Sequence, residues 1–113
     1  MDEPQYLRLA DDTFLRLEKA FRDVDPDAAD CERAGDVVTI TFASGQRCVV
    51  NTQRPTRQIW LAASARGWHF SYDAARGAWL DDKGSGDELF ATLARIVREQ
   101  AGVELAVPAP PAA

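Results

Sequence analysis

Residues 35–51, GDVVTITFASGQRCVVN, alternate between apolar and polar side chains with a period of two. Val38, Ile40 and Phe42 would share one face of a strand, with the intervening threonines on the other face. A short turn containing Ser and Gly then returns the chain along residues 47–51. The stretch therefore predicts a β-hairpin with one face for a core and one face for water.

Further strands are predicted on both sides of this hairpin. They cover residues 30–33, 58–64, 67–72 and 78–80. The connections between the last three are short and contain Gly, so that consecutive strands must be antiparallel neighbours. The sequence thus predicts a meander of five or six antiparallel strands.

The chain before the strands predicts an amphipathic helix. Apolar residues recur at helical spacing from Leu7 to Val24, which forms a stripe along one face. Pro4 lies where the first turn of a helix tolerates it. We expect Pro26 to end the helix, because the residue before a proline leaves the helical region.

A second helix is predicted after the strands. Ser85 and Glu88 have the spacing of a capping box, so we expect Ser85 to be the N-cap. The apolar face would consist of Leu89, Phe90, Leu93, Ile96 and Val97. Gly102 is expected to end this helix in a left-handed conformation.

These elements predict an α+β fold. The simplest packing is a two-layer sandwich in which the N- and C-terminal helices lie on one face of the antiparallel sheet. The other face of the sheet would remain open to water. The side chains expected beneath the helices are Ile40, Phe42, Ile59, Leu61, Trp68 and Phe70.

The composition describes a single compact domain. Of the 113 residues, 46% are hydrophobic and 27% charged, as in globular proteins that have their own core. No apolar run approaches the roughly 18 residues of a membrane span. The acidic, amphipathic start resembles neither a signal peptide nor a transit peptide. We therefore expect a cytoplasmic protein that has no membrane segment.

Two cysteines and one histidine limit the metal chemistry. Cys31 and Cys48 form no CxxC pair, and His69 is the single histidine, so a four-ligand zinc site is nearly excluded. We expect two half-buried strand thiols in a reducing compartment.

Charge is distributed unevenly along the chain, whose net charge is −5. Residues 1–36 hold eleven acidic and five basic side chains, residues 37–80 hold one and five, and residues 81–113 hold six and three. Two oppositely charged surfaces are therefore expected. The negative total argues against nucleic acid as a partner, because phosphates require a cationic face.

The strand predicted at 58–64 places its largest apolar side chain on the polar face. If Ile59 and Leu61 point toward the helices, Trp60 points to the open side, among amide and hydroxyl groups. An exposed aromatic ring in such surroundings is typical of a protein-binding hot spot. The alternative is that a loop or the C-terminal tail covers Trp60. We name as the partner face the residues Asn51, Gln53, Gln58, Trp60 and His69.

Carboxylates crowd the outer side of the first helix, the following turn and the first strand. We name as the acidic row the residues Asp11, Glu18, Asp23, Asp25, Asp27, Asp30 and Glu32. A hard cation bound through oxygen would relieve their repulsion, which suits Mg, Ca, Mn and iron. No preformed cage is evident, so binding is expected to be weak, exposed and multi-site. The alternative is an acidic helix face that contacts only water.

The central motif resembles the frataxin family. NTQRPTRQIWLA at 51–62, followed by GWHF at 67–70, is similar to the signature of its bacterial members, and RLAD, DCE, VTITFASGQ, WLDD and QAG also fit. The resemblance runs from about Tyr6 to Val107. It identifies residues 1–107 as a frataxin-like domain, and the composition of residues 108–113 predicts a disordered Pro/Ala-rich tail.

This resemblance implies the same helix–sheet–helix fold and a function. Members of the family bind Fe²⁺ and Fe³⁺ on an acidic ridge of the first helix and first strand. They also bind the cysteine desulfurase–scaffold complex that builds iron–sulfur clusters. By position, the ridge corresponds to the acidic row and the binding surface to the partner face. Lys19 and Arg22 occupy ridge positions that are often acidic in the family, so fewer or weaker iron sites are expected.

Three functions compete on this basis. The preferred one is an iron-binding regulator of iron–sulfur cluster assembly, which we expect to be a monomer in the bacterial cytoplasm. The second is a metal-independent interaction module that modulates the desulfurase through its acidic surface. An enzyme such as a ferroxidase is disfavoured, because the sequence contains no nucleophile motif, metalloprotease motif or phosphate loop.

Overall fold

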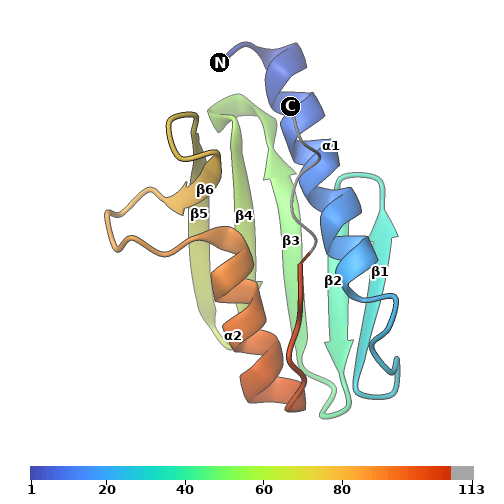
Figure 1. Ribbon diagram of the computed structural model, residues 1–113. Helices are drawn as coiled ribbons and strands as arrows, with labels where there is room; N and C mark the ends of the chain where they lie inside the picture. Colours follow the sequence, from blue (N-terminus) through green and yellow to red (C-terminus); the bar gives the residue numbers. More distant parts are fainter. Residues whose placement is uncertain (108–113) are drawn as a thin grey trace.

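The computed structural model describes residues 1–107 and has two layers, a six-stranded antiparallel sheet and two helices on one of its faces (Figure 1). The strands are β1 (Ala29–Ala34), β2 (Val37–Phe42), β3 (Arg47–Gln53), β4 (Gln58–Ala63), β5 (Arg66–Asp73) and β6 (Ala78–Asp81). They neighbour one another in sequence order, each pair antiparallel. The predicted α+β sandwich and meander are confirmed. The predicted tail at 108–113 lies outside the described residues.

Helix α1 (Glu3–Ala20) begins as expected but ends earlier than predicted. The side chain of Asp2 accepts a hydrogen bond from the backbone N–H of Gln5 and caps the helix. After Ala20 the chain forms tight turns, in which the N–H of Val24 donates to the carbonyl of Phe21 at 3.1 Å. Pro26 therefore follows the helix by several residues and does not end it.

Helix α2 (Leu89–Ala101) corrects the predicted N-cap. Ser85 lies in the preceding loop, where its hydroxyl donates to Asp81 at 2.6 Å. Glu88 is the N-cap instead, and its carboxylate accepts hydrogen bonds from the N–H groups of Phe90 and Ala91 at 2.8 and 3.0 Å. A carboxylate satisfies two of the otherwise unpaired donors there. Gly102 ends the helix at φ 66°, as predicted.

The core lies between the sheet and the helices. All six side chains predicted beneath the helices are buried. The helical stripes are mostly buried as well, although Leu7, Val24 and Phe90 are only partly covered. The largest core side chains that were not predicted to lie there are Tyr6 and Trp79, and Val50 and Cys48 are also buried.

Two hydrogen bonds donated by aromatic side chains join helix α1 to the sheet. The hydroxyl of Tyr6 donates to the backbone carbonyl of Gln58 on β4 at 2.6 Å. The indole Nε1 of Trp79 on β6 donates to the hydroxyl of Thr13 at 2.9 Å, and that hydroxyl donates to the carbonyl of Leu9. Because each buried polar group is satisfied, these bonds set the position of the helix over the sheet without an unpaired donor.

The segment after α2 runs back along the helix side of the sheet, between the two helices (Figure 1). Leu105 in this segment is buried in the core. The described C-terminal residues therefore leave the other sheet face uncovered. Neither helix in the described part of the chain has the length and apolar character to cross a membrane.

Candidate functional site

The open face of the sheet carries a row of three predicted partner residues. The register pairs Asn51 on β3 with Trp60 on β4, and Trp60 with His69 on β5. All three are partly exposed, while their neighbours along each strand, such as Ile59 and Phe70, are buried beneath the helices. The indole of Trp60 stacks on the imidazole of His69, with ring centroids 4.0 Å apart and planes within 12°.

Gln58 connects this row to a neighbouring row of side chains on the same open face. Its side-chain oxygen accepts a hydrogen bond from the indole Nε1 of Trp60 at 3.0 Å. Its amide nitrogen donates to Asp82 at 2.9 Å and to Ser71 at 3.1 Å. Trp60 is thus partly covered by Gln58 and His69, its neighbours on the open face. No described loop or C-terminal segment covers it.

The polar stretch between β3 and β4 positions the rest of the partner face. Residues Arg54–Thr56 form one turn of 3₁₀ helix, in which Pro55 needs no sheet hydrogen bond. Arg57 then adopts a left-handed conformation, φ 51°, and returns the chain to β4. This turn pairs Gln53 with Gln58 at the ends of their strands. The five predicted residues therefore occupy two adjacent rows of a single face.

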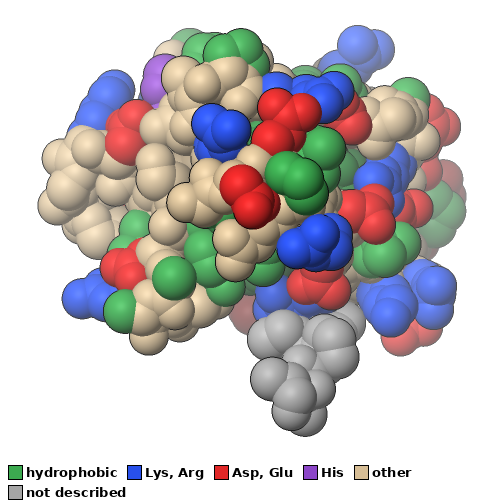
Figure 2. All heavy atoms as spheres, turned by 90° about the horizontal axis from the view of Figure 1, so that it is seen from above, with side chains coloured by type: hydrophobic (Ala, Val, Ile, Leu, Met, Phe, Trp, Pro, Cys, Tyr) green, Lys and Arg blue, Asp and Glu red, His purple; other side chains and the backbone are tan. Residues whose placement is uncertain are grey.

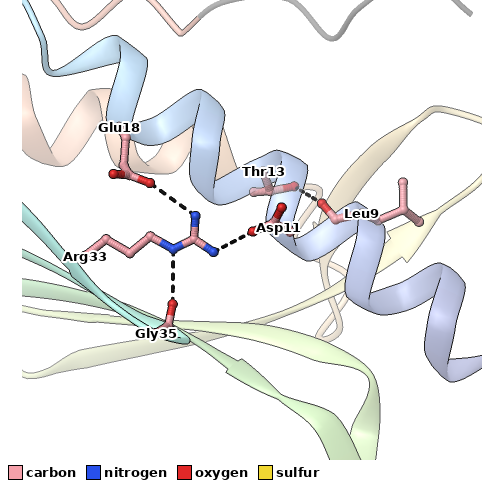
Figure 3. Close-up of polar contacts among 6 residues, drawn as sticks. All are labelled: Leu9, Asp11, Thr13, Glu18, Arg33 and Gly35. Atoms are coloured by element: carbon pink, nitrogen blue, oxygen red, sulfur yellow. Dashed lines mark hydrogen bonds and ion pairs between the residues drawn. The ribbon is translucent and has the colours of Figure 1, made fainter.

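The acidic row is divided by an arginine that the sequence reasoning did not consider. Arg33, on the helix side of β1, reaches toward α1 and bridges Asp11 and Glu18 (Figure 3). Its guanidinium donates to Asp11 at 2.6 Å and to Glu18 at 3.1 Å, and its Nε donates to the carbonyl of Gly35. The hydrogen bond to Asp11 is the main cause that raises the pKa of Arg33.

The remaining acids of the row point in different directions. Asp30 and Glu32 are paired with Thr41 and Thr39 on β2, which places them on the open face of the sheet. Asp25 lies in the turn and accepts a hydrogen bond from the N–H of Asp27. Within residues 1–107, no three carboxylate, thiol or imidazole groups converge as a single metal ion would require. The row is therefore a set of separate oxygen donors and not a chelating cage.

An open hollow of about 350 Å³ lies between the end of α1 and β1. Glu18, Arg22, Asp30 and Cys31 are among the residues that line it. Burial, followed by the charges of nearby carboxylates, raises the pKa of Cys31 to about 11. Cys31 is therefore a protonated thiol at neutral pH and a poor metal ligand. Cys31 is half-buried as predicted, whereas Cys48 is fully buried, and both are free.

Charges are mixed over the end of the molecule that carries the start of α1. Figure 2, which views the molecule from above, shows acidic and basic side chains interspersed on that end. One such pair joins Arg54 to Glu3 at 2.6 Å. This view therefore shows no extended surface of a single sign.

Two site residues escaped the sequence-based predictions for different reasons. Arg33 follows Glu32, and the strand alternation that places Glu32 on the open face places Arg33 under α1, so the pattern alone could have found it. Asp82 follows β6 and reaches Gln58 across 24 positions of sequence, and no local pattern indicates such a contact.

Comparisons with known proteins agree with this architecture. A family model described as a frataxin-like domain matches residues 1–103. A relative from Delftia acidovorans, named iron-sulfur cluster assembly protein CyaY, is 43% identical over 108 residues, covering 93% of this chain and 96% of the relative. A protein of the same name from Azotobacter vinelandii is 41% identical, with 96% of each chain covered.

Solved structures show the same fold. The frataxin from Psychromonas ingrahamii superposes with a TM-score of 0.86 at 27% identity, over 96% of this chain and all of that one. A trimeric frataxin from the yeast Saccharomyces cerevisiae, complexed with ferrous iron, superposes with a TM-score of 0.61 at 26% identity, over 91% and 88% of the two chains. Together with the matched domain, these likenesses show that the chain belongs to the frataxin family.

Proposed function

We propose that this protein is an iron-binding regulator of iron–sulfur cluster assembly in the bacterial cytoplasm. In this proposal it binds Fe²⁺ or Fe³⁺ weakly on the acidic row and docks on the cysteine desulfurase–scaffold complex through the partner face. The observation that carries the proposal is the Trp60–His69 stack on an uncovered polar sheet face, in a chain similar to relatives named for cluster assembly.

The iron half of the proposal rests on carboxylate oxygens, which suit hard cations. Arg33 pairs with Asp11 and Glu18, so these two are the least available members of the row. The other five have no ion pair within residues 1–107 and would bind iron first. Binding by such separated donors is weak and exchanges quickly.

An anaerobic titration with Fe²⁺, followed by amide NMR, tests the iron half. We expect broadening or shifts between residues 23 and 32 at lower iron concentrations than at Asp11. The double variant Asp25→Asn/Asp30→Asn should weaken the response, whereas Asp73→Asn, at the distant β5–β6 turn, serves as the matched control. If millimolar iron moves no resonance in residues 11–32, the iron half is wrong.

The partner half of the proposal is tested by binding to the purified desulfurase and scaffold. Trp60→Ala should weaken the complex by about tenfold or more, as expected for a central aromatic anchor. Leu15→Ala is the control, because Leu15 is an apolar side chain exposed on α1, on the opposite side of the molecule. Equal effects of the two variants would remove the partner face from the proposal.

A second candidate function is the metal-independent interaction module. It is favoured by the ion pairs of Arg33 and by the lack of a three-ligand group among the described residues. Docking through exposed charges weakens as salt shortens the Debye length. Charge reversal at Asp23 and Asp25 should then weaken the complex without iron. If charge reversal at Asp23 and charge reversal at Asp25 both left the affinity unchanged at low salt, this candidate would be rejected.

A further inference from the structure

The hydrogen bonds around Gln58 have a fixed direction. The side-chain amide of Gln58 has one oxygen, which accepts from the indole of Trp60, and one nitrogen, which donates to Asp82 and Ser71. An amide that is turned over would present its oxygen to Asp82 and its N–H groups to the indole N–H. A carboxylate can only accept and an indole N–H can only donate, so both contacts would become unfavourable.

Asp82 is the charged member of this chain of hydrogen bonds and reinforces its direction. Hydrogen bonds to an ionised carboxylate are about twice as strong as neutral ones. Ser71 cannot play this role, because a hydroxyl can donate or accept. The indole N–H and Asp82 therefore impose the same orientation on the Gln58 amide, and Asp82 supplies the stronger, charge-assisted contact.

The backbone holds Asp82 in place opposite the aromatic stack. Its N–H donates to the carbonyl of His69 at 2.8 Å, so the residue is fixed to β5 beyond the end of β6. Its carboxylate Oδ2, which accepts from Gln58, is also 3.8 Å from Nδ1 of His69. One carboxylate therefore contacts Gln58, the acceptor of the indole N–H, and lies beside the imidazole on which the indole stacks.

We propose that Asp82 is a positioning residue of the partner face, which orients Gln58 and thereby presents Trp60 in one conformation. This inference rests on the proposed docking role of Trp60. The indole N–H is used within the protein, so the partner recognises the ring by apolar contact. The complementary surface would be an apolar side chain or pocket that offers no acceptor to the indole. Preorganised anchors bind more tightly because less side-chain freedom is lost on association.

The test compares Asp82→Ala with Asp81→Ala. Each variant removes one negative charge, but Asp81 is paired in register with Phe70, on the helix face of the sheet, and contacts Ser85. Two quantities are measured in the full-length protein: the indole N–H resonance of Trp60 with its hydrogen exchange, and the affinity for the desulfurase–scaffold complex. The Trp60 resonance is identified by its loss in Trp60→Phe.

Asp82→Ala should shift the indole resonance, speed its exchange and weaken binding by about five- to tenfold, as expected when an anchor loses its orientation. Asp81→Ala should change neither quantity. Asp82→Asn keeps one acceptor oxygen and should restore part of both. If Asp82→Ala changes the indole signal but not the affinity, or if Asp81→Ala matches its effects, the inference is overturned. A lack of effect of Trp60→Ala on affinity would instead refute the docking role itself.

Discussion

At the scale of single residues, two tryptophans eight positions apart have opposite roles. Trp68 points into the core and is 5% exposed, whereas Trp60 points to the open face and stacks on His69. Trp68→Ala should lower the free energy of unfolding by about 3–5 kcal/mol through cavity formation. Trp60→Ala should cost about 1 kcal/mol, the value of a lost aromatic contact. Urea denaturation measures both losses of stability. Equal losses would contradict the outward orientation of Trp60 on β4.

The buried thiol of Cys48 predicts a loss of stability at high pH. Burial, with a smaller effect of Cys31, raises the pKa of Cys48 to about 12, from 9.0 for an ordinary thiol. Between these values the unfolded chain releases a proton that the folded protein retains. The free energy of unfolding therefore has its full value below pH 9 and falls as pH rises toward 12, by up to about 4 kcal/mol.

The variant Cys48→Val, which keeps volume and removes the thiol, isolates this effect. Other groups that ionise above pH 9 affect both proteins equally, so the difference between the two pH profiles reports Cys48. We expect the variant to lose less stability than the original protein between pH 9 and 11, as measured by urea denaturation. Parallel profiles would show that the thiol does not titrate with folding.

At the scale of elements, the β4–β5 hairpin turns through two residues that both have left-handed backbones. Ser64 and Ala65 have φ values of 50° and 63°, a conformation that costs a residue with a Cβ about 1–2 kcal/mol relative to Gly. Ala65→Gly should therefore raise the free energy of unfolding by about 0.5–1 kcal/mol, once the greater freedom of Gly in the unfolded chain is subtracted. Thermal and urea denaturation measure the gain.

Gly45, in the turn between β2 and β3, provides the reverse control for this substitution. It has φ 88°, and a Cβ added there would meet no atom within 4 Å, so Gly45→Ala changes only the backbone preference. It should lower stability by a similar amount. If both substitutions changed stability in the same direction, backbone strain would not be the cause.

The sequence predicted the helices and strands themselves better than it predicted the ends of the helices. Period-two and helical spacing placed all six strands and both helices, because burial of one face imposes those periods. The predicted N-cap of α2 is wrong because Ser85, the better cap by residue type, is held by Asp81 and leaves Glu88 to cap the helix. That contact depends on how the loop after β6 folds, which local spacing does not determine.

At the scale of the whole molecule, strand alternation predicted which face of the sheet carries the candidate site but not the contacts that organise it. Alternation placed Gln58, Trp60 and His69 on one face, as the register confirms. The contacts that organise this face and the acidic row come from Asp82 and Arg33, each joining elements separated in sequence. Alternation within β1 could have placed Arg33 beneath α1, but the partners that Arg33 and Asp82 contact are set by the packing of complete elements.

Arg33 connects the two layers of the molecule and competes with any cation at α1. Arg33→Gln should lower the free energy of unfolding by about 1 kcal/mol, because its ion pairs with Asp11 and Glu18 are partly exposed. It should also let Fe²⁺ reach these two carboxylates at about fivefold lower concentration, since a neighbouring positive charge is removed.

Arg54→Gln is the matched control, because it frees one acid, Glu3, at the other end of the helix. Amide shifts of Asp11 and Glu18 under anaerobic iron titration measure the difference. If the two variants respond alike, the change in net charge explains the result, and Arg33 has no specific role in excluding iron from α1.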